Sequence, residues 1–150
     1  MRTYEDFTEG LEIDLGPYPV TRDEVIEFAR EFDPQPFHLD EEAAKDTLLG
    51  GLSASGWHSC AMMMRMMADA YILDSSSQGS PGVEYVRWKR PVRPGDVLRG
   101  TARVVSRRLS SKRPTLGILK ITTDLRNQTG ETVLESAYTL LVLTREGLAA

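Results

Sequence analysis

The 150-residue chain contains a single cysteine, Cys60, so no disulfide can form within it. This scarcity is typical of proteins kept in a reducing compartment, and we expect a cytoplasmic location. The first ten residues, MRTYEDFTEG, lack an apolar run behind a basic start, so no secretory signal is predicted.

Histidines and long uncharged apolar runs are also scarce. The only histidines are His38 and His58, and they form no convincing metal-ligand set with Cys60, so neither a metal nor a cofactor is predicted. The longest apolar stretch, 57–73, is interrupted by charged Arg65 and Asp69. Because a membrane span needs about 18 or more nearly uncharged residues, we expect no membrane association.

The chain has no overall excess of basic charge. Its formal net charge is −4 and its pI is about 5.2, which argues against general nucleic-acid binding. The charge is unevenly distributed: residues 1–46 hold fourteen acids and four bases (−10), and residues 87–113 hold ten bases and one acid (+9). The basic stretch is consistent with a site for the phosphates of a nucleotide-like carrier, or with the solvent-facing side of strands.

Length and composition predict one domain spanning residues 1–150. Apolar residues make up 41% of the chain and charged residues 27%, as in ordinary globular proteins. The polar segment 74–82, DSSSQGSPG, separates a helical half from a strand-rich half. Each half is too small to be an independent domain.

A capped amphipathic helix is predicted over residues 21–32. Thr21 and Glu24 have the spacing of a capping box, and apolar residues recur at helical spacing through Phe32. Pro34 disfavours helical geometry at the residue before it, so the helix should end there and place Asp33 just beyond its end. A second, short helix is predicted after Asp40.

The apolar residues of 57–73 do not keep to one face, which predicts a helix buried on nearly all sides. Arg65 and Asp69 have the spacing of a pair on one face of that helix.

Alternating or continuous apolar patterns predict five strands, around residues 11–20, 83–92, 97–109, 115–127 and 131–145. Short turns at 94–96 and 127–130 imply that the strands they separate are antiparallel neighbours. The predicted class is α+β, with a sheet that wraps and buries the long helix.

The segment FDPQPFHLD, residues 32–40, is the strongest candidate for a catalytic loop. It places Asp33 and His38 on either side of Pro34 and Pro36, which stiffen the chain. A straight polyproline-like path would separate the two by about 15 Å. Both can act on one water only if the chain bends near Pro36 and Phe37. The alternative is structural: an aspartate that solvates a turn, and a histidine that is an ordinary satisfied polar group.

The segment GGLSASGWHS, residues 50–59, is the second candidate element. Either Ser53 or Ser55 is expected to cap the following helix, which places Gly56 near its first turn. Backbone N–H groups there have no helical partner, so that of Gly56 is available to hold the oxygen of a polarised carbonyl. The alternative is an ordinary glycine near a helix start.

These two segments, FDPQPFHLDEEAA and GGLSASGWH, with Gly56 eighteen residues after His38, resemble the MaoC-like dehydratases, which include the (R)-specific enoyl-CoA hydratases. The resemblance implies the hotdog fold, in which a curved antiparallel sheet wraps a long central helix. In the family's motif, Gln35 stands here for the usual asparagine and Phe37 for a smaller aliphatic residue. Met64 stands where several relatives have a serine on the central helix, near the site. These departures indicate an altered acyl group.

The resemblance implies that Asp33 and His38 activate one water, which adds across the trans-2 double bond of an enoyl thioester to give a 3-hydroxyacyl thioester. The Gly56 N–H is expected to stabilise charge on the thioester oxygen. Further residues expected to contact or surround the substrate are Ser55, Gln35, Phe37, Trp57 and His58. The implied substrate carrier is coenzyme A or acyl carrier protein. The implied assembly is a homodimer or a larger homo-oligomer. In it, the Arg-rich strands of one chain are expected to contact the phosphates of the coenzyme A that the partner chain binds.

Two other functions remain open at this point. A hotdog thioesterase needs a carboxylate near the start of the central helix, and no acid follows Gly56 until Asp69. A non-catalytic acyl-thioester binding protein would keep the fold without turnover, and the departures at Gln35 and Met64 keep this alternative open.

Overall fold

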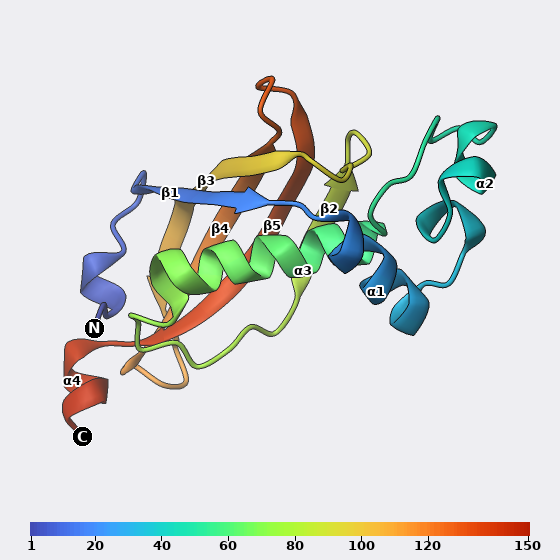
Figure 1. The fold of residues 1–150 in the computed structure, drawn as a ribbon. Coiled ribbons are helices and arrows are strands. Elements are labelled where there is room, and N and C mark those ends of the chain that lie inside the picture. Colours follow the sequence, from blue (N-terminus) through green and yellow to red (C-terminus); the bar gives the residue numbers. More distant parts are fainter.

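A five-stranded antiparallel sheet curves around one long helix in the computed structural model, which describes residues 1–150 (Figure 1). The strand order is β1-β3-β4-β5-β2. The strands are β1 (Glu12–Pro19), β2 (Val83–Trp88), β3 (Val97–Leu109), β4 (Leu116–Arg126) and β5 (Thr132–Leu143). The α-helices are α1 (Arg22–Phe32), α2 (Glu41–Lys45), α3 (Gly56–Met67) and α4 (Arg145–Ala149). The long helix α3 lies along the sheet, while α1 and α2 lie together at one end of it.

The core lies between α3 and the concave face of the sheet. Side chains alternate along β4, so Leu119, Ile121 and Leu125 are fully buried while their neighbours are partly exposed. Methionines of α3, Met62 and Met66 among them, pack into this core from the other side. The unbranched thioether side chain suits such irregular contacts.

The start and end of α1 are as predicted. The Glu24 N–H donates to the Thr21 hydroxyl at 3.3 Å, and the Thr21 N–H donates to the Glu24 carboxylate at 3.2 Å, which completes the capping box. The last helical residue is Phe32, and the N–H of Asp33 still donates to the Ala29 carbonyl at 2.9 Å. Asp33 is therefore held one residue past the helix end. The predicted cap at Asp40 is also present, at the start of α2.

The prediction that the strands on either side of the 94–96 turn are neighbours is wrong. β2 pairs with β5, and β1 takes the place beside β3. The connection from Lys89 to Asp96 contains Pro91 and Pro94 and is longer than the two to five residues of a hairpin loop. It instead carries the chain across the end of the sheet, next to the start of α3. The other predicted turn, 127–130, does join the antiparallel neighbours β4 and β5.

The prediction that the central helix is buried on nearly all sides is also wrong for this chain by itself. A stripe of three residues on α3, Trp57, Ala61 and Met64, is exposed, with 65% of Trp57 and 48% of Met64 accessible. One sheet covers only one side of a helix, so the opposite side is left bare. The predicted Arg65–Asp69 pair is present, with Nε and Oδ2 3.0 Å apart. After Met67 the helix widens into one π turn, Ala68–Ile72.

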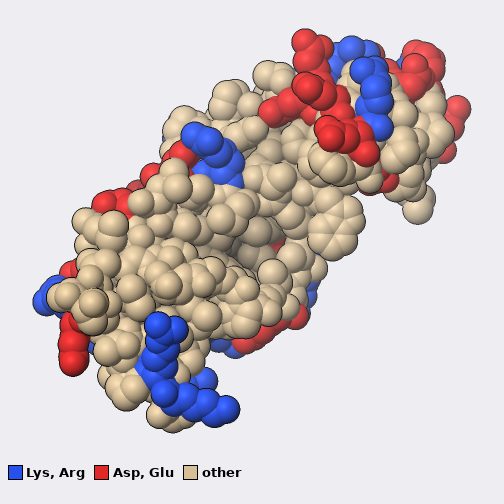
Figure 2. Space-filling view, turned by 90° about the horizontal axis from the view of Figure 1, so that it is seen from below, with Lys and Arg blue, Asp and Glu red and all other residues tan.

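Charged side chains are concentrated toward the ends of the face seen in Figure 2, most densely at the end that carries α1 and α2. The middle of this face has few charges. No helix has the length and hydropathy expected of a membrane span.

Candidate active site

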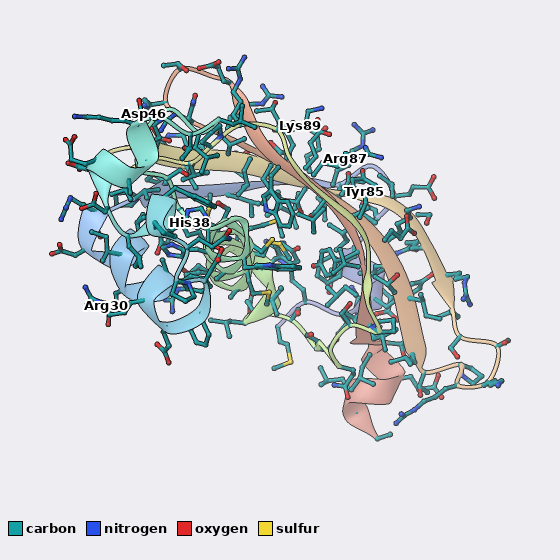
Figure 3. All side chains as sticks on the ribbon, turned by 90° about the vertical axis from the view of Figure 1, so that its right-hand side faces the viewer. Arg30, His38, Asp46, Tyr85, Arg87 and Lys89 are labelled. Carbon is teal, nitrogen blue, oxygen red and sulfur yellow. The ribbon has the colours of Figure 1, made fainter.

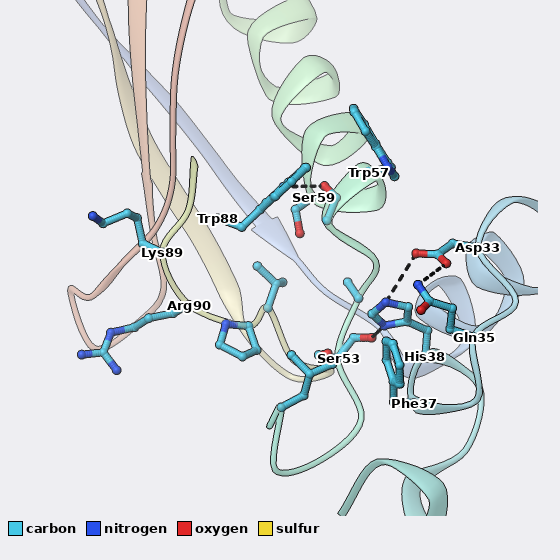
Figure 4. A pocket seen from close by; sticks show the side chains of 15 residues that line it. Asp33, Gln35, Phe37, His38, Ser53, Trp57, Ser59, Trp88, Lys89 and Arg90 are labelled. Atoms are coloured by element: carbon cyan, nitrogen blue, oxygen red, sulfur yellow. Dashed lines mark hydrogen bonds and ion pairs between the residues drawn. The ribbon is translucent and has the colours of Figure 1, made fainter. Parts of the chain in front are cut away.

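The bend required to bring Asp33 and His38 together is present. Residues Pro36–His38 form one turn of 3₁₀ helix, and the Asp40 N–H donates to the Pro36 carbonyl at 3.0 Å. The chain thereby folds back, and His38 Nε2 lies 3.4 Å from Asp33 Oδ2 (Figure 4). Both side chains are largely buried, with 8% of the His38 side chain and 18% of the Asp33 side chain accessible.

The orientation of the imidazole is set by a backbone carbonyl. His38 Nδ1 lies 2.7 Å from the Ser53 carbonyl oxygen. A carbonyl only accepts hydrogen bonds, so Nδ1 carries the proton and donates it. In neutral His38 the other nitrogen, Nε2, is then an unprotonated acceptor that faces Asp33.

The environment of Asp33 favours the ionised form of its carboxylate. Burial raises its pKa, but hydrogen bonds from the Ser55 hydroxyl and the Gln35 amide outweigh burial and hold the pKa below its usual range, and His38 adds to this lowering when it is protonated. The Gln35 amide donates to Asp33 Oδ1 at 2.7 Å, which leaves Oδ2 directed at the imidazole. A carboxylate and a lone pair thus face each other 3.4 Å apart, and a water lying beside the pair can donate one hydrogen to each acceptor.

Gly56 is the first residue of α3, and its N–H has no carbonyl partner within the helix. Ser55 is the cap: its hydroxyl accepts from the Trp57 N–H at 3.3 Å. The Trp88 indole, from the end of β2, donates to the Gly56 carbonyl at 2.9 Å.

These elements surround one cavity of about 390 Å³. Of the residues that the sequence singled out, Asp33, Gln35, Phe37, His38, Gly56 and Trp57 line it. Sequence reasoning missed the contribution of Ser53, Ser59, Trp88, Lys89 and Arg90, which also line it. The basic stretch 87–113 was a signal for Lys89 and Arg90, whereas a backbone carbonyl such as that of Ser53 leaves none. Figure 3 shows His38 inside the α1–α2 end, with Lys89 at the end of β2.

His58 and Ser55 do not line this cavity. The His58 ring stacks on Phe28 of α1, with centroids 4.6 Å apart and planes 7° apart, and its Nδ1 has no hydrogen-bond partner. Burial lowers the pKa of His58, and the Glu24 carboxylate opposes that shift. Ser55 is fully buried, caps α3 and donates a hydrogen bond to Asp33.

A second, largely apolar cavity of about 320 Å³ lies beside the first, between α3 and β2. Its lining includes Cys60, Met63, Met64 and Val86, and Trp57 lines both cavities. No group of three or more His, Cys, Asp or Glu side chains is placed to hold a metal ion.

Comparison with known families places these features in context. Residues 8–124 match the family model described as "MaoC like domain". The chain belongs to the MaoC-like family. The predicted hotdog fold is confirmed, because the MaoC-like dehydratase from Rhodospirillum rubrum superposes with a TM-score of 0.90. That structure is 38% identical, and the match covers 97% of this chain and 99% of the other.

Two further relatives extend the comparison of this MaoC-like chain. The uncharacterized protein YdeM of Bacillus subtilis is 28% identical over 138 residues, which are 92% of this chain and 96% of YdeM. The (R)-hydratase PhaJ1 from Pseudomonas aeruginosa superposes with a TM-score of 0.72 at 21% identity, over 95% of this chain and 86% of PhaJ1. At that identity the likeness to PhaJ1 shows a shared fold.

Proposed function

We propose that this MaoC-like protein hydrates enoyl thioesters, adding water across the trans-2 double bond to give a 3-hydroxyacyl thioester, and that it catalyses the reverse dehydration. The observation that carries this proposal is the 3.4 Å approach of two acceptors, His38 Nε2 and Asp33 Oδ2, in a cavity that Gly56 also lines. The 38% identical relative described as a MaoC-like dehydratase supports the same reaction class.

In the proposed reaction, one water donates its hydrogens to Asp33 Oδ2 and His38 Nε2, so its oxygen lone pair is directed at the substrate. The oxygen bonds to C3 of the enoyl group while one water proton passes to the catalytic pair, and a proton is delivered from the pair to C2. Negative charge that develops on the thioester oxygen is stabilised by the Gly56 N–H. The net change is one water added and the C2–C3 double bond consumed.

The surroundings suit the two ends of an acyl thioester. We assign the acyl chain to the apolar cavity lined by Met63 and Met64, which adjoins the first at Trp57. Lys89 and Arg90 line the first cavity. Lys89 is in no ion pair, so its ammonium is available to a phosphate of coenzyme A.

A second copy of the chain is the partner that we assign to the bare side of α3. Trp57 and Met64 on the helix and Val83 and Trp88 on the edge strand β2 are all exposed large apolar residues. An edge strand next to an apolar stripe is suited to pairing with its own copy. Sedimentation equilibrium would give twice the 16.8 kDa chain mass or a larger multiple, and a monomer would contradict the assignment.

The decisive assay uses crotonyl-CoA. Formation of 3-hydroxybutyryl-CoA, with loss of the conjugated thioester absorbance, supports the proposal. Release of free coenzyme A thiol would instead identify a thioesterase. Saturable binding without either product, on a panel of enoyl thioesters, would identify a non-catalytic binding protein.

Variants of the pair test the assigned roles. Asp33→Asn and His38→Ala should each lower kcat by roughly 10²–10⁴-fold, the range typical of general acid–base groups, with unchanged thermal unfolding. Asp46→Asn at the end of α2 and His58→Gln outside the cavity are matched controls that should keep full activity. Full activity in both pair variants would overturn the roles.

A further inference from the structure

The carbonyl that orients His38 belongs to a loop with little structure of its own. Ser53 lies in the segment 47–54, which contains no helix or strand and includes Gly50 and Gly51. Leu48, in the same segment, is fully exposed, with 107% of its surface accessible. The side chains of Leu52 and Ala54 are buried in the core and anchor the loop on either side of Ser53. Between these anchors, hydrogen bonds to the loop backbone help to fix the direction of the Ser53 carbonyl.

Two of these hydrogen bonds come from Arg93, in the connection between β2 and β3. Its guanidinium donates through Nη2 to the Leu49 carbonyl and through Nη1 to the Leu52 carbonyl, the latter at 3.4 Å. The adjacent Val92 carbonyl accepts from the Ala54 N–H at 2.8 Å. Three hydrogen bonds therefore join the loop on both sides of Ser53 to residues 92–93.

Arg93 is itself held in a tight turn at the start of β3. Its backbone N–H donates to Asp96 Oδ2 at 2.9 Å, and the Asp96 N–H donates to the Arg93 carbonyl at 3.0 Å. The guanidinium is partly buried and forms no ion pair with any carboxylate. Its two donors to carbonyls are thus its only polar contacts within the chain.

We propose that Arg93 is a positioning residue for His38: it holds the loop so that the Ser53 carbonyl keeps the imidazole proton on Nδ1 and leaves Nε2 free toward Asp33. This inference rests on the proposed function, in which Nε2 binds the reacting water. Without the guanidinium, the Ala54–Val92 bond is the only hydrogen bond left between the loop and residues 92–93. The Ser53 carbonyl is then less firmly directed at Nδ1, and the imidazole is free to exchange tautomers.

Two substitutions disturb this arrangement in different ways. Arg93→Lys keeps the charge but replaces a planar fork of donors by a single ammonium, which does not reach both carbonyls in the same geometry. Gly51→Ala leaves Arg93 unchanged, but its Cβ would lie 2.9 Å from Arg93 Nη1, closer than real contacts allow. The guanidinium would have to move away from the loop.

The test combines nitrogen-15 NMR of the histidine rings with crotonyl-CoA kinetics on the full-length protein. In the wild type at a pH where His38 is neutral, Nδ1 should give the protonated signal and Nε2 the unprotonated one. In Arg93→Ala, Arg93→Lys and Gly51→Ala, both nitrogens should shift toward a mixture of tautomers. Because small misplacements of catalytic groups are costly, kcat should fall on the order of 10- to 100-fold while KM changes little.

Arg126→Ala is the matched control, since Arg126 pairs with Asp124 on the opposite side of the sheet and should change neither readout. A folded Arg93→Ala protein with the wild-type tautomer and kcat would overturn the proposal. If that variant does not fold, Arg93→Lys and Gly51→Ala decide the question by the same criteria. If the wild type hydrates no enoyl thioester, the proposed function fails, and the NMR signals still show whether Arg93 sets the tautomer.

Discussion

The Trp88 indole lies directly against Gly56. Its Nε1–H donates to the Gly56 carbonyl at 2.9 Å, and a Cβ added at position 56 would fall 2.6 Å from Trp88 Cε2. A glycine at the start of α3 is therefore required by packing, independently of any role for its N–H in catalysis. The contact also joins the edge strand β2 to the first turn of the helix.

Gly56→Ala should accordingly displace the Trp88 ring and lower kcat/KM on crotonyl-CoA by about tenfold or more, since the N–H and the cavity wall move together. Tryptophan fluorescence would report the displacement of the ring. Gly82→Ala is the control, because an added Cβ there meets nothing within 4 Å. An alanine variant with wild-type fluorescence and activity would show that the contact is dispensable.

Met64→Trp should reduce the room in the apolar cavity and so change acyl-chain selectivity. Met64 lines this cavity and does not line the one that holds Asp33 and His38. We expect kcat/KM for octenoyl-CoA to fall by about tenfold relative to that for crotonyl-CoA, the range typical of steric discrimination by a few methylenes in an apolar pocket. Arg65→Ala, on the neighbouring helix position outside the cavity, should leave the ratio unchanged. An equal loss on both substrates would argue that the acyl chain lies elsewhere.

His58 should make the fold less stable in mild acid. Burial lowers its pKa in the folded protein from the ordinary 6.5, with Glu24 opposing, so below that pH the unfolded chain binds more protons than the folded one. Stability is then lost as the pH falls below 6.5, and above it neutral His58 contributes no pH dependence. Urea unfolding of the wild type and His58→Phe, which can keep the stack on Phe28, should show a shallower acid loss in the variant. Identical slopes would contradict this.

The buried hydroxyls of Tyr71 and Tyr138 should act as a unit. They lie 2.6 Å apart, and burial raises both pKa values, that of Tyr138 to about 12. Tyr138→Phe leaves the Tyr71 hydroxyl without a partner and should cost about 1–3 kcal/mol in the free energy of unfolding. The double variant Tyr71→Phe/Tyr138→Phe should cost less than the sum of the two single variants. Additive losses in urea unfolding, with Tyr85→Phe as control, would show that the pair is not coupled.

Much of the fold was predictable because the sequence signals for it, helix caps and prolines, act over only a few residues. The Thr21–Glu24 capping box and Pro34 predicted where α1 begins and ends, and the structure confirms both. The bend at Pro36 was required by the catalytic hypothesis, and it is present as a 3₁₀ turn. The neighbours of β2 were predicted wrongly, because a turn signal at 94–96 does not reveal that the chain first crosses the end of the sheet.

Local periodicity also explains why His58 lies outside the cavity. Successive residues of an α-helix are about 100° apart around its axis, so position 58 points about 200° away from Gly56. It therefore packs on Phe28 of α1, whereas Trp57 stays at the cavity. Helical spacing in the first turn of α3 would have been enough to predict that Trp57 lines the cavity and that His58 does not.

The chain's own order of residues was sufficient to predict a capped helix that ends just before Asp33, a stiff loop leading to His38, and a glycine at the start of α3. Caps, prolines and side-chain periodicity act over a few residues, so they can be seen in the sequence. The meeting of the Ser53 carbonyl with His38, of Arg93 with the loop, and of Trp88 with Gly56 depended on how distant segments fold together. Every residue has a backbone carbonyl, so only the path of the folded chain selects the one that an imidazole finds.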